Sequence, residues 1–124
     1  MKILIPLLLT VMTFTSCSSH IKYVKKMPIC DVDLTSIQDG VYRGSFAYGR
    51  GKGFTYEVQT YVTNHRIVKI EVSQHNGTKY PKKAERVLKR IIDSQTPNVD
   101  VVSGATTVSK ALMKAVENSL IKNQ

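Results

Sequence analysis

The residues best suited to chemistry lie in one short stretch, residues 100–107 of the 124-residue chain. A run of small residues there is followed by the adjacent hydroxyl groups of Thr106 and Thr107. Small residues let a ligand approach the backbone closely, and a helix starting here would direct N–H groups and its positive dipole end at a phosphate. The same residue types are also the usual caps of helices. From this stretch alone, phosphate binding and simple helix capping both remain open.

Two predicted helices flank the stretch. Pro81 suits the first position of a helix, and Thr96-Pro97 marks a stop within the break at residues 94–99. A second helix runs from about Thr107 to Ile121. In both helices, apolar residues recur at the three-and-four spacing that gives a helix one buried face. These faces consist of Ala84, Val87, Leu88, Ile91 and Ile92 in the first helix and of Val108, Ala111, Leu112, Ala115, Val116 and Leu120 in the second.

Three predicted strands precede the helices, over Val41–Tyr48, Phe54–Thr63 and Ile67–Gln74. Gly49–Gly53 suits a hairpin loop that needs positive φ angles, and Asn64-His65 suits a tight turn. The alternating strands predict one buried and one polar face. The fold class is therefore α+β, an antiparallel β-meander or half-barrel packed by two amphipathic helices. The residues expected to share a face within each strand are Tyr42, Gly44, Phe46 and Tyr48; Phe54, Tyr56, Val58, Thr60 and Val62; and Val68, Ile70 and Val72.

The first residues predict export. Residues 1–16 contain a lysine and then an apolar run that is shorter than the ~20 residues of a membrane-spanning helix, as in a cleaved signal peptide. Phe14-Thr15-Ser16-Cys17 resembles the lipobox of bacterial lipoproteins, with Phe14 in place of the usual leucine. This resemblance implies that Cys17 is acylated and anchors the protein on the extracytoplasmic face of a membrane of the bacterial cell envelope. An ordinary signal peptide is the alternative.

The chain after the signal divides into two predicted parts. Residues 17–38 are polar and are expected to be the lipidated cysteine and a tether, and residues 39–124 are expected to form the folded domain. The formal net charge of +9 favours anionic headgroups, phosphate-bearing ligands or nucleic acid, and export argues against nucleic acid. The basic residues of Lys82–Arg90 fit either a solvated helix face or a face held against anionic lipid. The sequence has no spacing typical of a metal site.

Asp100–Thr106 resembles the acidic-x-x-Ser/Thr-Gly-Ala-Thr signature of the FMN-binding domain family. That family includes the C subunit of the sodium-pumping NADH:quinone reductase and the corresponding flavoprotein subunit of Rnf-type electron-transport complexes. The resemblance extends in the family's order over residues 39–121, which makes it more specific than one short motif. The other matching segments are Asp39–Gly44, Ile67–Val72, Ser94–Thr96 with Val99–Asp100, and the small-residue helix over 111–120.

The resemblance implies a covalently bound cofactor. In the family, a separate Mg²⁺-dependent flavin transferase takes FMN from FAD and links it to the last threonine of the signature through a phosphoester bond. By position, the acceptor in this chain is Thr106. Asp100 would either serve the transferase or brace the turn. The turn and the hydrogen bonds around the phosphate would come from Ser103, Gly104, Ala105 and Thr107.

Some residues around this signature depart from the family. The family often has Thr-Ser two and three residues beyond the acceptor, where this chain has Val108-Ser109. Larger members carry a His-x-Glu-Thr-type stretch, of which His75 keeps the histidine without the glutamate. His75 therefore either faces the isoalloxazine ring or lies in a solvated loop. The aromatic residues expected to fill the core, one or two of them stacking on the flavin, are Tyr42, Phe46, Tyr48 and Tyr56.

Together these features predict an exported lipoprotein that carries FMN and transfers electrons. A flavin transferase would mature it, a membrane reductase or electron-transport complex would exchange electrons with it, and the lipid would hold it at the membrane. Two other hypotheses remain open. The flavin could itself reduce a small extracytoplasmic substrate, or the chain could be an envelope interaction module without a cofactor.

Overall fold

The computed structural model describes residues 23–48, 54–76 and 81–121. The predicted signal 1–16, Cys17 and the hairpin loop Gly49–Gly53 lie outside the described residues. Within these ranges the elements follow in the order η1 (Leu34–Ser36), β1 (Gly40–Tyr48), β2 (Phe54–Thr63), β3 (Arg66–Asn76), η2 (Lys82–Glu85), α2 (Arg86–Ser94) and α3 (Thr106–Ile121), where η marks a 3₁₀-helix.

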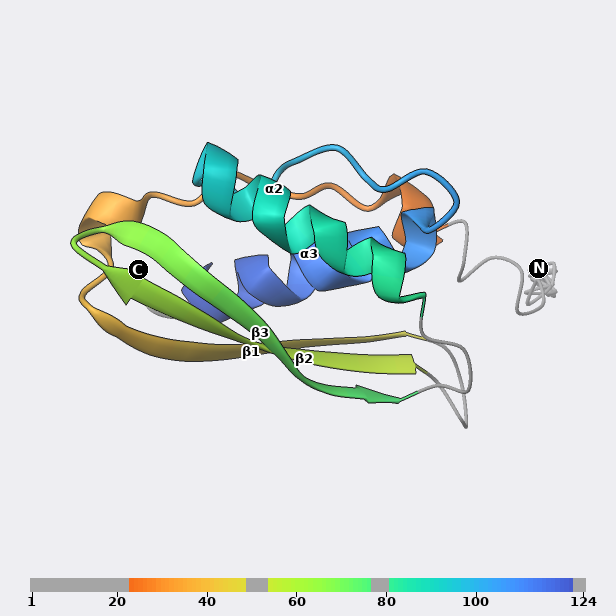
Figure 1. The fold of residues 1–124 in the computed structure, drawn as a ribbon, viewed down its shortest axis with the longest axis horizontal. Coiled ribbons are helices and arrows are strands. Elements are labelled where there is room, and N and C mark those ends of the chain that lie inside the picture. Colours follow the sequence, from red (N-terminus) through yellow and green to blue (C-terminus); the bar gives the residue numbers. More distant parts are fainter. Residues whose placement is uncertain (1–22, 49–53, 77–80, 122–124) are drawn as a thin grey trace, which may run out of the picture.

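The three strands form an open antiparallel sheet in the order β1-β2-β3, and α2 and α3 lie together on one of its faces (Figure 1). The predicted α+β class is therefore confirmed. The turn at Asn64-His65 is confirmed as well, since both residues have the positive φ angles that tight hairpins require, 51° and 60°. Among the described helices, none is long and apolar enough to cross a bilayer.

Strand β2 lies at the centre of the sheet and has the face that its alternation predicts. Tyr56, Val58 and Val62 are each at most 2% exposed, and Thr60 is fully buried among them. The Thr60 hydroxyl is satisfied, because it lies 2.8 Å from the hydroxyl of Ser119 on α3. The alternation of apolar residues therefore placed the central strand correctly against the helices.

The predicted face of β3 is wrong at one residue. Val68 was expected to share a face with Ile70, but its side chain is 52% exposed, whereas Ile67 is buried. Ile67 pairs with Val62 and Lys69 with Tyr61, so Val68 is an extra residue in a β-bulge. A bulge shifts the alternation by one residue. Both Ile67 and Ile70 can therefore face the core, and Val68 points to solvent.

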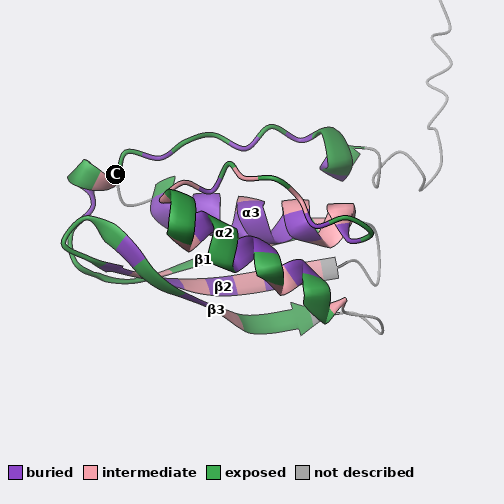
Figure 2. Ribbon diagram, turned by 45° about the horizontal axis from the view of Figure 1, so that its top comes forward, coloured by how far each residue is buried: buried purple, intermediate pink, exposed green. Residues whose placement is uncertain are grey.

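Helix α3 packs against β1 and β2, and α2 packs against β3 and α3. Figure 2 shows α3 as the most thoroughly buried element, and its buried residues include the polar Ser109, Glu117 and Ser119. Close packing on β1 depends on Gly44, because a Cβ there would overlap the Ala115 carbonyl oxygen and the Ser119 amide nitrogen. The glycine thus lets strand and helix backbones touch.

Helix α2 ends at a residue that also ties it to the sheet. Gln95 caps α2 in the left-handed conformation, with φ of 57°. Its side-chain amide accepts a hydrogen bond from the Ile67 N–H at 2.7 Å and donates one to the Ile67 carbonyl at 2.9 Å. The amide therefore pairs with the outer edge of β3 as a short piece of strand would, and it fixes where the loop after α2 begins.

Residues 24–37 differ from the predicted tether, because they contribute to the core. Figure 2 shows this segment running along the far side of the helices from the sheet. Its apolar residues follow neither a helical nor a strand period, and for that reason the sequence predicted a tether. Five of its side chains are nevertheless buried: Val24, Met27, Ile29, Val32 and Ile37.

Polar contacts hold the same segment onto α3. The Lys110 ammonium donates to the Met27 carbonyl at 3.1 Å, and the buried Glu117 carboxylate accepts from the Cys30 N–H at 3.3 Å. Lys114 pairs with Glu117 at 3.0 Å. A buried carboxylate without such partners would be strongly destabilising. The course of residues 24–37 over α3 is therefore fixed by both packing and hydrogen bonds.

Candidate functional site

The loop that enters α3 makes a tight bend. The Ala105 N–H donates to the Val102 carbonyl at 2.9 Å, and Gly104 adopts a φ of +78°. This left-handed conformation is costly for residues with a Cβ, which explains the glycine. Thr106 is the first residue of α3. The sequence therefore predicted both the bend and, within one residue, the start of the helix.

Two residues that the sequence did not single out hold this bend in place. The Ser109 hydroxyl, fully buried in the first turns of α3, accepts from the Val102 N–H at 3.1 Å. The Arg90 guanidinium reaches across from α2 and donates to the carbonyls of Asp100 and Val101, both at 2.9 Å. Ser109 stands at the serine position of the family's Thr-Ser pair, but both side chains bind backbone groups, and a sequence motif does not reveal such contacts.

Replacing Ser109 with alanine is expected to destabilise the bend. The substitution leaves the buried Val102 N–H without an acceptor, which costs about 1–3 kcal/mol of unfolding free energy. Urea unfolding followed by circular dichroism measures the loss. Ser103→Ala is the matched control, because Ser103 is exposed on the same loop. Equal stabilities for the two variants would show that the Ser109 hydroxyl contributes nothing to the bend.

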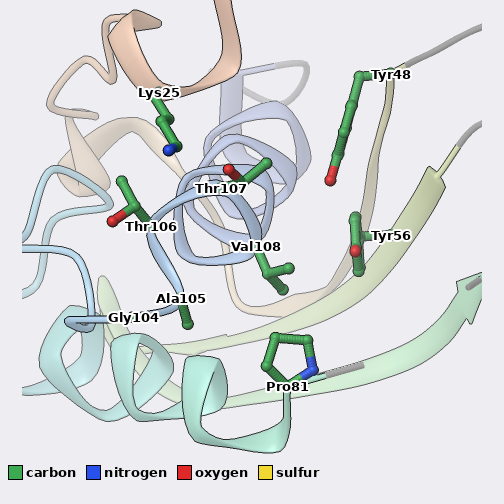
Figure 3. Close-up of a pocket in the computed structure, with 9 residues that line it drawn as sticks. All are labelled: Lys25, Tyr48, Tyr56, Pro81, Gly104, Ala105, Thr106, Thr107 and Val108. Carbon is green, nitrogen blue, oxygen red and sulfur yellow. The ribbon is translucent and has the colours of Figure 1, made fainter. Parts of the chain in front are cut away.

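A cavity of about 370 Å³ opens beside this bend, between the start of α3 and the sheet (Figure 3). Cavities that enclose small-molecule ligands occupy roughly 300–1,000 Å³. Its lining combines the bend with parts of the chain far from it in sequence. The lining residues are Lys25, Tyr48, Tyr56, Pro81, Gly104, Ala105, Thr106, Thr107 and Val108.

Two tyrosines form the sheet side of the cavity. Figure 3 shows Tyr48 and Tyr56 side by side on β1 and β2, across the cavity from the start of α3. Their ring centroids are 6.3 Å apart with an angle of 20° between the planes, and Phe46 extends the stack, 5.9 Å from Tyr48. Burial raises the pKa of both phenols, and the neighbouring Tyr56 raises the pKa of Tyr48 further. The wall therefore stays uncharged.

The predicted site residues divide into two groups. Gly104, Ala105, Thr106 and Thr107 line the cavity together. The others do not line it. Ser103 is exposed on the bend, and Asp100 is exposed beside a separate hollow that includes Arg90. His75 is exposed near the end of β3, directly opposite Tyr56 in the sheet register. It lies next to the aromatic wall rather than within the lining.

Lys25 is a lining residue that the sequence analysis missed. It was assigned to the tether, and its spacing from the bend in sequence gives no sign that the two meet. Pro81 was expected only as a helix start, and it also closes one side of the cavity. Tyr48 and Tyr56 were among the aromatics expected to fill the core or stack on the flavin, and they are the two that line the cavity.

The lining fits the parts of an FMN molecule. Aromatic faces suit a planar isoalloxazine ring, since aromatic pairs favour offset stacking. The N-terminus of the sixteen-residue helix α3 and the small residues before it suit a phosphate. The Thr106 and Thr107 hydroxyls lie where that phosphate would dock. The ring and phosphate ends thus have separate, chemically matched surfaces.

Comparison with known proteins agrees with this chemistry. The family of FMN-binding domains matches residues 51–121, more than half of the chain. That match contains β2, β3, α2, α3 and the bend. It begins after β1, which forms the first strand of the same sheet.

Two curated proteins are similar to part of the chain. NADH:acrylate oxidoreductase of Vibrio harveyi is 36% identical over 77 residues, which is 60% of this chain and 8% of that protein. NADH:fumarate oxidoreductase of Klebsiella pneumoniae (strain 342) is 36% identical over 62 residues, 48% of this chain and 7% of that protein. The matched segment therefore spans less than a tenth of the length of either enzyme.

Proposed function

The chain belongs to the FMN-binding domain family and its cofactor is FMN, and we propose that it carries this flavin covalently on Thr106 and relays electrons at a membrane surface. The observation that carries the proposal is the position of Thr106. It is the first residue of α3, and it lines a cavity whose opposite wall is aromatic. An acceptor hydroxyl there would hold the phosphate at the helix N-terminus and leave the ring free to reach the tyrosines.

The attachment step is a phosphoryl transfer. The Thr106 oxygen forms a bond to the riboflavin-side phosphorus of FAD, the phosphoanhydride bond breaks, AMP leaves and the hydroxyl proton is released. A flavin transferase with Mg²⁺ would catalyse it. A covalent link keeps the site filled where free flavin is scarce, because occupancy no longer depends on a dissociation constant.

An electron-carrying role fits the chain better than a complete reductase. The curated relatives are named as reductases of acrylate and fumarate, but the matched segment is only 8% and 7% of their lengths. When bound, FMN supplies reversible electron transfer. The lining residues bind and shield the flavin: they are small, hydroxylic, aromatic or basic, and none carries a carboxylate or an imidazole. A separate donor and acceptor would therefore complete the reaction.

The proposed setting is the bacterial cell envelope. Acylation of Cys17 would anchor the protein on the extracytoplasmic face of a membrane, and more than one acyl chain gives stable anchoring. This position supports a membrane reductase or electron-transport complex as the partner that exchanges electrons with the flavin.

Covalent flavin is tested by co-expressing the full chain with a flavin transferase. Acid precipitation should leave the yellow colour in the protein pellet. The intact mass should rise by one FMN less one water, and peptide mapping should place the addition on Thr106. A colourless pellet with an unmodified Thr106 peptide would rule out the covalent carrier. The reductase hypothesis predicts instead that purified holo-protein reduces a small acceptor such as acrylate or fumarate without a partner.

A further inference from the structure

We infer that Lys25 and Lys83 form a two-lysine clamp that binds the phosphate group of the flavin at the bend before α3. This inference rests on the proposed function and names further residues of the same site. Lys25 belongs to the segment that was expected to be a tether, and Lys83 belongs to the basic residues that were expected either to be solvated or to lie against anionic lipid. Neither is part of the Asp100–Thr106 signature.

Lys83 lies directly over the glycine of the bend. A Cβ built on Gly104 would be 2.6 Å from the Lys83 Nζ atom and 3.5 Å from its Cε. The ammonium group therefore occupies the space next to the Gly104 backbone. Its position is set by η2, where the neighbouring Ala84 is fully buried and the Ala84 N–H donates to the Pro81 carbonyl at 2.8 Å.

Lys25 approaches the same bend from the N-terminal segment. Residues 23–26 form a helical turn, and the buried side chains of Val24 and Met27 fix that turn against the core. Figure 3 shows the Lys25 ammonium group directed at the first turn of α3, near Thr106 and Thr107. The buried course of this segment is therefore what places a second cation at the site.

Neither ammonium group forms an ion pair with an acid among residues 23–48, 54–76 and 81–121, where Lys69–Glu71 and Lys114–Glu117 are ion pairs of other lysines. No carboxylate lines the cavity either. Two unmatched cations beside a helix N-terminus form a site for an anion, and a flavin phosphate attached to Thr106 would lie between them. Such a clamp would bind the phosphate group of the flavin and would not contribute to binding of the isoalloxazine ring.

Comparing FMN with riboflavin isolates the phosphate. Apo-protein made without a transferase is titrated with each flavin, and binding is followed by flavin fluorescence. We expect the wild-type chain to prefer FMN over riboflavin. Lys25→Gln and Lys83→Gln should each reduce that preference about tenfold, equivalent to ~1.4 kcal/mol, with riboflavin affinity unchanged. Lys25→Arg and Lys83→Arg should largely retain it, because arginine also binds phosphate.

Lys82→Gln is the matched control, because Lys82 is an exposed lysine on η2 whose side chain, unlike that of Lys83, does not lie against Gly104. It should keep the wild-type preference. If the Lys25 and Lys83 variants keep that preference, or lose FMN and riboflavin affinity equally, the clamp is wrong while the proposed function stands. If the wild-type chain binds neither flavin and gains none on Thr106 with the transferase, both proposals fail.

Discussion

Replacing Thr106 with alanine is expected to abolish acid-stable flavin completely. The substitution removes the oxygen that forms the bond to phosphorus, and no other group can restore that bond. The cavity remains, so FMN should still bind reversibly, and its occupancy should fall as free FMN is diluted. The measurement is flavin absorbance in the acid-precipitated pellet and in the supernatant. Colour should move from the pellet to the supernatant.

Two neighbouring variants make this test specific. Thr107→Ala removes the adjacent hydroxyl, which also lines the cavity, and it should leave the flavin on Thr106. Thr106→Ser keeps a hydroxyl at the acceptor position and should retain attachment. A yellow pellet from the Thr106→Ala protein would assign the acceptor to another residue. If the Thr107→Ala pellet were colourless and the Thr106→Ala pellet were yellow, the acceptor would be Thr107.

Replacing Gly44 with alanine is expected to cause a large loss of stability, because it adds a methyl group where strand and helix backbones touch. The added Cβ would overlap backbone atoms of α3 at Ala115 and Ser119, and it would lie 2.6 Å from the Ser119 Cβ. Backbone atoms cannot rotate away, so helix and sheet must separate. Overpacking costs roughly 1–3 kcal/mol and occasionally more, and we expect about 3 kcal/mol here. For a domain of this size that lowers Tm by roughly 15 °C.

Gly40 provides the control on the same strand. A Cβ at Gly40 would be 3.5 Å from the Tyr42 hydroxyl, which is an ordinary contact. Gly40→Ala should therefore leave Tm nearly unchanged. Thermal unfolding followed by circular dichroism compares the two variants. A Gly44→Ala protein as stable as Gly40→Ala would mean that α3 does not rest on β1 as closely as the structure has it.

The parts of the fold that follow a regular period could be predicted from the sequence. Strand β2 was predicted to the residue, and the buried faces of α2 and α3 came from their three-and-four spacing. The failures occur where the period breaks. Val68 sits in a bulge that one strand's own sequence does not reveal. Residues 24–37 pack with irregular spacing, so no periodic signal marked them as part of the core.

The site divides in the same way. The bend and the Thr106 acceptor position were found from local residue types and a resemblance, because the bend is built from consecutive residues. The roles of Arg90, Ser109 and Lys25 could not be found in this way. These residues act through contacts with residues distant in sequence or with backbone groups, and such contacts exist only once α2, α3 and the N-terminal segment have packed together.

The buried course of residues 24–37 also limits how far the protein can travel from its anchor. If Cys17 carries lipid as we propose, only six virtual bonds separate its Cα from that of Tyr23, where the described structure begins. Even fully extended, they reach about 20 Å. That radius is shorter than α3 itself, whose sixteen residues rise roughly 24 Å. The domain and its flavin would therefore stay close to the bilayer surface. A redox partner that is free in solution would have to approach that surface to exchange electrons with the flavin.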